Sequence, residues 1–94
     1  MADKITRELK LLNKYGMHVR PAGLFAKTAS RFDADITVEK DGNVVSGKSI
    51  MALMTLEAVC GVTLKVTASG NQAQEAMDEL AALVERKFDI PDEQ

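Results

Sequence analysis

The side chains best suited to chemistry are one histidine and an arginine two positions after it. His18 is the only histidine of the chain, and Arg20 stands directly before Pro21. A neutral imidazole is a nucleophile near pH 7, and a guanidinium presents planar donors to phosphate oxygens. Pro21 is well placed to begin a helix, because its missing N–H would have no intrahelical acceptor there. His18 would then lie at a helix N-terminus, where a negative charge is favoured. Its imidazole could therefore accept and release a transferable anionic group.

A lone histidine in a small domain is more often a surface residue or a satisfied core residue. The arrangement around it must therefore carry the functional interpretation. Gly16 permits a tight or left-handed turn just before His18. The turn, the arginine and the helix start converge on one imidazole, and we take residues 16–21 as the candidate site.

The composition narrows the classes of function. The 94 residues suffice for one domain over 1–94, with a modest core expected over about 5–88 and an acidic tail at 89–94. A net charge of −2 and an aromatic content of 4% speak against nucleic-acid binding. Because Cys60 and His18 are single residues of their types, neither an intramolecular disulfide nor a metal site is expected.

The sequence also sets expectations for location and assembly. It shows neither a signal peptide nor a run of about 20 apolar residues that could form a membrane helix. We therefore expect a cytoplasmic protein without membrane insertion. No large exposed apolar helix face demands a second copy, so we expect a monomer.

Hydrophobic periodicity predicts four strands and three helices. Alternation of apolar and polar residues indicates strands over residues 5–11, 35–40, 43–47 and 63–68. Helical spacing indicates helices over 21–32, in a short segment capped by Ser49, and from Asn71 to Phe88. The order βαββαβα predicts an α+β open-faced β-sandwich, in which three helices cover one face of a four-stranded antiparallel sheet.

Local signals mark several boundaries of these elements. Asp41 and Gly42 form a strong hairpin turn signal between the second and third strands. Asn71 followed by Gln74 resembles a capping box at the start of the last helix. Pro91 and the acidic tail cannot extend that helix, and fraying is expected there.

The short helix after Ser49 offers a candidate docking surface. Ile50, Leu53 and Met54 can share its inward face, which leaves Met51 partly outside. An exposed methionine suits an adaptable docking surface, whereas the alternative places Met51, Leu53 and Met54 all in the core.

Residues 42–49 match the spacing of a nucleotide-binding P-loop, Gly-x-x-x-x-Gly-Lys-Ser. That loop should follow a buried strand and lead into a long helix within a parallel α/β fold. Here the intervening residues read as a strand that leaves a hairpin. We therefore reject an ATP-binding enzyme.

Two segments together resemble the motifs of the histidine-containing phosphocarrier protein (HPr) family of the phosphoenolpyruvate-dependent phosphotransferase system. Residues 16–21, Gly-Met-His-Val-Arg-Pro, are similar to its active-site signature Gly-x-His-Ala-Arg-Pro. Residues 48–51, Lys-Ser-Ile-Met, with Met54, are similar to its regulatory serine segment. The resemblance spans about residues 5–88, and the family has the same βαββαβα order.

The resemblance implies a phosphoryl carrier and not an independent catalyst. His18 would accept a phosphoryl group from Enzyme I and donate it to a histidine on an enzyme IIA-type acceptor, with Arg20 supporting the phosphate. Ser49 would be a candidate for phosphorylation by HPr kinase/phosphorylase, the alternative being a helix cap alone. No cofactor and no metal are implied. The candidates for partner contact are Val19, Ile50, Met51 and Met54.

Several positions depart from the usual family pattern. Val19 stands where alanine or threonine is common, and Tyr15 where many sugar-system members have a small polar residue. Glu57 stands where those members often have glycine, and Cys60 replaces a frequent lysine. Residues 14–18 are also similar to the nitrogen-related branch (NPr), which commonly departs from the Lys-Ser-Ile-Met that is intact here. An NPr-like or other regulatory module that acts by docking is therefore the alternative function.

Overall fold

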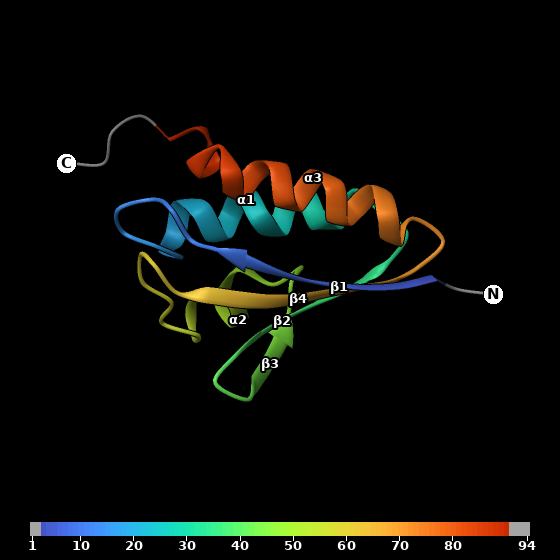
Figure 1. The fold of residues 1–94 in the computed structure, drawn as a ribbon, viewed down its shortest axis with the longest axis horizontal. Coiled ribbons are helices and arrows are strands. Elements are labelled where there is room, and N and C mark those ends of the chain that lie inside the picture. Colours follow the sequence, from blue (N-terminus) through green and yellow to red (C-terminus); the bar gives the residue numbers. More distant parts are fainter. Residues whose placement is uncertain (1–2, 91–94) are drawn as a thin grey trace.

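The sheet and helices follow one another in the order β1, α1, β2, β3, α2, β4, α3 (Figure 1). The fold is a computed structural model that describes residues 3–90. The strands are β1 (Asp3–Lys10), β2 (Asp35–Lys40), β3 (Asn43–Ser46) and β4 (Thr63–Gly70). The helices are α1 (Val19–Ser30), α2 (Ile50–Met54) and α3 (Ala73–Glu85), followed by the 3-10 turn η1 (Lys87–Asp89). The predicted βαββαβα order is confirmed.

All strand pairs of the sheet are antiparallel, and the strands lie in the order β1-β4-β2-β3. Ala68 on β4 pairs with Ile5 on one side and Ile36 on the other, and these side chains face the core. The next rung turns its side chains to the opposite face, where the hydroxyl oxygens of Thr6 and Thr67 lie 3.1 Å apart in a hydrogen bond. This alternation gives the sheet one apolar and one polar face.

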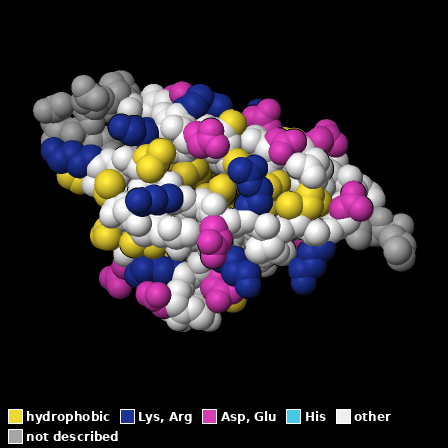
Figure 2. Space-filling model, viewed as in Figure 1, with side chains coloured by type: hydrophobic (Ala, Val, Ile, Leu, Met, Phe, Trp, Pro, Cys, Tyr) yellow, Lys and Arg dark blue, Asp and Glu magenta, His cyan; other side chains and the backbone are white. Residues whose placement is uncertain are grey.

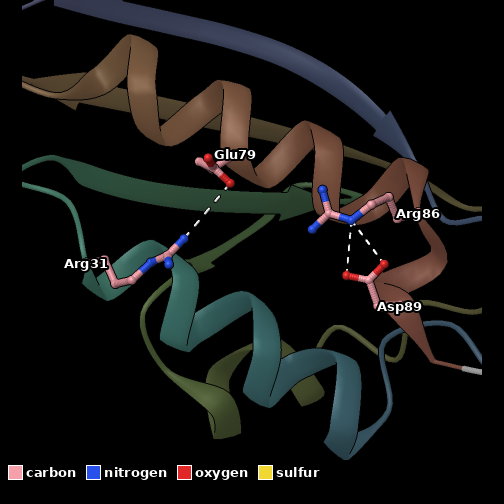
Figure 3. Close-up of polar contacts among 4 residues, drawn as sticks. All are labelled: Arg31, Glu79, Arg86 and Asp89. Carbon is pink, nitrogen blue, oxygen red and sulfur yellow. Dashed lines mark hydrogen bonds and ion pairs between the residues drawn. The ribbon is translucent and has the colours of Figure 1, made fainter.

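Helices α1 and α3 run side by side over the apolar face of the sheet (Figure 1). Each helix buries a stripe that includes Phe25 and Ala29 from α1 and Met77 and Leu80 from α3. Arg31, directly after the end of α1, and Glu79 of α3 form an exposed ion pair of 4.0 Å (Figure 3). The short α2 packs against α1 and β3. The open-faced sandwich expected from the sequence is confirmed.

The connection from β2 to β3 is the predicted hairpin, and it contains no phosphate loop. Asp41 and Gly42 both have positive φ, 51° and 84°, as a two-residue hairpin turn requires. Gly47 is buried after β3, where a Cβ would lie 2.6 Å from Ile36 Cγ2. Side-chain packing therefore explains this glycine, and the P-loop spacing of residues 42–49 has no nucleotide-binding structure behind it.

Helix α1 begins earlier than the sequence predicts. Its first residue is Val19, and the first helical bond runs from Ala22 N–H to the His18 carbonyl at 2.9 Å. Pro21 is the third helical residue and not the first. The N–H groups of a first turn have no intrahelical acceptor, so proline fits at this position as well. The helix also ends at Ser30, two residues before the predicted end.

The predicted capping box at the start of α3 is wrong. The N-cap is Gln72, whose side chain makes no capping bond. Its Oε1 accepts from the Asp33 N–H at 2.7 Å, and Asn71 Nδ2 donates to Asp33 Oδ2 at 3.0 Å. Gln74 bonds to Asp78 along the helix. The polar side chains therefore tie the helix start to the segment before β2, which no local pattern reveals.

The end of α3 also differs from the sequence prediction. The helix ends at Glu85, and Phe88 is buried from η1, where it has a φ of 60°. Arg86 Nε donates to both carboxylate oxygens of Asp89, at 3.1 and 3.0 Å, across this turn (Figure 3). Phe88 thus joins the core without lying on the helical stripe. The expectation for Pro91 and the rest of the acidic tail lies outside the described residues.

The surface carries both signs of charge. Lys and Arg side chains alternate with Asp and Glu on the face seen in Figure 2, without a large region of one sign. No helix within residues 3–90 is long and apolar enough to cross a membrane. In the same part of the chain no three His, Cys, Asp or Glu residues are grouped so as to hold a metal ion.

Candidate functional site

His18 is the N-cap residue of α1. Its backbone is extended, with φ −84° and ψ −171°, and its carbonyl accepts the first helical bond. The side chain is half-buried and takes no part in capping the helix. The fold therefore places the imidazole at the helix entrance, as predicted, without using it for helix capping.

The start of α1 provides a positive environment beside this imidazole. The N–H groups of Val19 and Arg20 have no intrahelical acceptor, and Pro21 has no N–H. The first turn carries no carboxylate to neutralise the helix end. The exposed Arg20 adds a full positive charge two residues from His18. An anion at the imidazole would therefore lie beside the positive end of the helix.

The segment before His18 is held by the loop that follows α2. The Met17 N–H donates to the Ala58 carbonyl at 2.8 Å, and the Gly61 N–H donates to the Leu11 carbonyl at 2.8 Å. Gly16 has a φ of +64°, and a Cβ on it would lie 2.7 Å from Val59 Cα and against the Ala58 carbonyl oxygen. Glycine at position 16 is thus required by backbone conformation and by close approach of a second loop.

Asn13 stabilises the turn before His18, and sequence reasoning missed it. Its side chain is only 2% exposed, and Nδ2 donates to the Gly16 carbonyl at 2.7 Å. The Gly16 N–H donates back to the Asn13 carbonyl at 3.2 Å. The buried Asn13 Oδ1 has no hydrogen-bond partner within residues 3–90. Asparagine after two leucines is a turn signal that could have pointed to this residue.

Tyr15 lies against the imidazole. The ring centroids of Tyr15 and His18 are 6.0 Å apart, and the ring planes meet at 86° in an edge-to-face arrangement. Lys14 Nζ lies 5.3 Å from the centroid of the Tyr15 ring. This contact between the two rings is not predicted by the sequence pattern.

The four candidate contact residues form an exposed apolar surface, which we call the docking patch: Val19, Ile50, Met51 and Met54. Met51 is 80% exposed, and Val19 is 61% exposed. The Cδ1 of Ile50 lies 4.0 Å from the Cβ position of Gly23, which shares the face of α1 with Val19 four residues away. The structure therefore brings the start of α1, with His18 as its N-cap, and α2 together.

The prediction that Ile50, Leu53 and Met54 share the inward face of α2 is wrong for Ile50 and Met54. Leu53 is fully buried, whereas Ile50 and Met54 are 43% and 40% exposed. The helix has only five residues, little more than one turn, so a single position can point into the core. The alternative that Met51, Leu53 and Met54 are all core residues is wrong as well.

Ser49 is the N-cap of α2, as predicted. Its Oγ accepts from the Ala52 N–H at 3.1 Å, and the residue is half-buried. The capping role is therefore real, and it coexists with a position directly before two residues of the docking patch.

Glu57 occupies a backbone conformation that favours glycine. It is exposed, with a φ of 51°, directly after the turn that ends α2. The left-handed conformation costs a residue with a Cβ about 1 kcal/mol or more, and glycine avoids this cost. Glu57 therefore carries a local backbone strain.

Replacing Glu57 by glycine is expected to stabilise the protein by about 0.5–1 kcal/mol, which would raise the melting temperature by roughly 2–6 °C. Thermal unfolding followed by circular dichroism measures this shift. The control is Glu57→Ala, which removes the same charge and keeps a Cβ in the left-handed region. An equal gain from both variants would show that charge, and not backbone strain, is responsible.

Two further features are a free cysteine in the loop after α2 and a surface depression apart from His18. Cys60 is exposed, and its Sγ lies 3.8 Å from the Leu12 carbonyl oxygen. A surface depression of about 350 Å³ lies at the C-terminal end of α1. It is lined by Phe32, Asp33, Ala34, Asp35, Lys48, Ser69, Gly70 and Asn71. It does not include His18.

Known proteins of similar sequence are named as phosphocarriers or as HPr-like proteins. The HPr-like protein Crh of Halalkalibacterium halodurans is 41% identical over 83 residues, which cover 88% of this chain and 99% of that protein. The phosphocarrier protein HPr of Vibrio cholerae is 41% identical over 80 residues, or 85% of this chain and 94% of that one. The phosphocarrier protein NPr of Shewanella violacea is 38% identical over 86 residues, or 92% and 94%.

Solved structures agree with this likeness. HPr-C-His from Thermoanaerobacter tengcongensis matches with a TM-score of 0.83 and 44% identity, over 94% of this chain and 97% of that chain. An HPr dimer from the same organism matches with a TM-score of 0.73 and 45% identity, over 85% and 92%.

The fold, the histidine at the helix entrance and the similar proteins define a phosphocarrier of the phosphotransferase system. Residues 5–86 match the family model described as PTS HPr component phosphorylation site. The chain belongs to the HPr family.

Proposed function

We propose that this protein carries a phosphoryl group on His18 from phospho-Enzyme I to an enzyme IIA-type acceptor. The observation that carries the proposal is the position of His18 as N-cap of α1, with a side chain that takes no part in capping and with Arg20 in the first turn. The docking patch beside it gives partners an apolar surface to bind.

The transfer follows from ordinary phosphoryl chemistry. A lone pair on the neutral imidazole, on Nδ1 as the family resemblance implies, attacks phosphorus on the donor histidine. A new P–N bond forms on His18 while the P–N bond to the donor breaks, and the electron pair returns to the donor nitrogen. Arg20 and the helix N-terminus stabilise the charge on the phosphoryl oxygens. The second transfer repeats the step with His18 as the leaving group.

The role of Ser49 forms part of the proposal. HPr kinase/phosphorylase would phosphorylate the Oγ that now accepts from Ala52. The phosphate would bring a charge of about −1.5 to −2 next to Ile50 and Met51. A charge at an apolar contact surface carries a desolvation cost, so Enzyme I would bind or transfer less well.

The alternative is an NPr-like or other regulatory module that acts mainly by docking. It is favoured by relatives named Crh and NPr, whose identities of 41% and 38% are close to that of HPr. In both cases we place the protein in the cytoplasm. We propose a monomer as the acting form, although two similar solved structures, one of HPr and one of Crh, are described as dimers.

Incubation with Enzyme I and phosphoenolpyruvate tests the carrier function. We expect one acid-labile phosphoryl group per chain, detected by intact mass and mapped to His18. The control is His18→Ala, which should fold normally because the imidazole does not cap α1. Adding enzyme IIA-type acceptors of the sugar and nitrogen branches separately then identifies the branch by the rate of discharge. Absence of labelling with an active Enzyme I from the same cell would contradict the carrier and favour the docking module.

A further inference from the structure

We propose that Tyr15 is a positioning residue that fixes the imidazole ring of His18 for phosphoryl transfer, and that Lys14 holds the tyrosine in place. The inference rests on the proposed function of His18 and adds a residue to it. The Tyr15 and His18 centroids lie 6.0 Å apart with planes at 86°, which is within the range of edge-to-face aromatic pairs.

The imidazole needs such a contact because its backbone does not determine the ring orientation. The N-cap position fixes where the His18 Cα and Cβ lie. The second side-chain torsion of histidine has broad and roughly two-fold preferences, so the backbone alone does not choose among several orientations of the two ring nitrogens. A neighbouring ring at right angles favours some of these orientations over others. Phosphoryl transfer requires one nitrogen to be aligned with phosphorus, so the contact bears directly on the chemical step.

Tyr15 is well placed to impose this orientation because its own backbone is held on both sides. The turn across Asn13 and Gly16 is closed by the two hydrogen bonds of 2.7 and 3.2 Å. The next residue, Met17, is tied to Ala58 at 2.8 Å. Tyr15 therefore approaches His18 from a constrained turn and not from a mobile loop.

Lys14 adds a second contact to the tyrosine. Its ammonium lies 5.3 Å from the Tyr15 centroid, inside the distance of about 6 Å for cation–π attraction. Lys14 is exposed, so this contribution is the smaller of the two. Lys14 thus contacts Tyr15, and Tyr15 contacts His18. None of these three residues belongs to the docking patch.

Steady-state phosphorylation by Enzyme I tests the proposal on the wild type, Tyr15→Phe and Tyr15→Leu. Loss of an aromatic pair predicts a kcat about three- to tenfold lower for Tyr15→Leu, with an unchanged KM, and little change for Tyr15→Phe, which keeps the ring. Lys14→Gln should lower kcat by about twofold, whereas Lys14→Arg retains a cation and should not. Ring-current shifts of the His18 protons in NMR spectra should change in Tyr15→Leu and persist in Tyr15→Phe.

Three results would overturn the positioning role. A raised KM with an unchanged kcat would make Tyr15 a partner contact. Equal losses in Tyr15→Phe and Tyr15→Leu would assign the effect to the hydroxyl. Unchanged kinetics in Tyr15→Leu, with a normal melting temperature, would leave the ring contact without a role.

A small phosphoryl donor separates this proposal from the proposed function. Phosphoramidate can react with a histidine without protein docking, so the lower rate of Tyr15→Leu should persist with it. If Enzyme I does not label the wild type, the proposed carrier function is wrong. The phosphoramidate rates and the NMR shifts of wild type and Tyr15→Leu still test the positioning role of Tyr15. If Enzyme I and phosphoramidate each label the wild type and Tyr15→Leu at equal rates, the carrier function is supported and the positioning role is wrong.

Discussion

Replacing Gly16 by alanine is expected to destabilise the protein by about 3 kcal/mol or more and to impair phosphorylation of His18. Two costs add at this position. The left-handed φ of +64° disfavours any residue with a Cβ, and that Cβ would lie 2.7 Å from Val59 Cα. Since Val59 contributes backbone here, relief requires the two loops to separate, which breaks the Met17–Ala58 hydrogen bond. Chemical denaturation measures the loss of stability.

Gly42→Ala is the matched control for this prediction. Gly42 also has a positive φ, 84°, but among the described residues no heavy atom other than those of Gly42 and its two chain neighbours lies within 4 Å of its Cβ position. It should show the conformational cost alone, about 1–2 kcal/mol. Equal losses in the two variants would contradict the steric argument at Gly16. The phosphorylation rate per folded molecule should fall in Gly16→Ala and stay normal in Gly42→Ala, because only the first displaces the residues before His18.

Replacing Ser49 by aspartate is expected to slow phosphoryl transfer from Enzyme I about 30-fold, with little effect on stability. Aspartate caps helices as well as serine does, so the bond from Ala52 N–H should be retained. The new charge lies directly before Ile50 and Met51, which are exposed in the docking patch. A cost of about 2 kcal/mol for an unpaired charge at this contact corresponds to the 30-fold effect.

Ser49→Asn distinguishes the effect of the negative charge from the effect of changing the helix N-cap residue. Asparagine is equally good at an N-cap and nearly identical in shape to aspartate, but it is neutral. The rates of both variants with Enzyme I and phosphoenolpyruvate, at increasing salt, give the comparison. If Ser49→Asp and Ser49→Asn transfer at the same rate, the regulatory proposal is wrong and Ser49 is a helix cap alone.

Local features of the chain could be predicted from sequence because their causes are local. The strand over 35–40 is correct to the residue, since alternation with a period of two is a property of neighbouring residues. The hairpin at Asp41 and Gly42 and the cap at Ser49 depend on backbone preferences and short-range hydrogen bonds. The start of α1 was placed within two residues, near enough to set His18 at its entrance.

Features that depend on partners distant in sequence could not be predicted in this way. Asn71 and Gln72 bond to Asp33, which lies 38 and 39 positions away, and therefore do not cap as their local pattern suggests. The exposure of Ile50 and Met54 depends on how α2 sits against α1 and β3. Helical periodicity cannot predict this exposure, because it shows which residues share a face of a helix but not which element packs against that face.

The order of the elements, the family resemblance and the candidate nucleophile His18 could all be read from the sequence. The packing of the fold supplied the distant part of the surroundings of that histidine, the loop of Ala58 and Val59 that lies against Gly16. The physical reason lies in the range of the interactions. Alternation, capping and turn preferences act over a few residues, whereas the loop contacts that enclose the site form only when chain segments about 40 residues apart are brought together by the buried core.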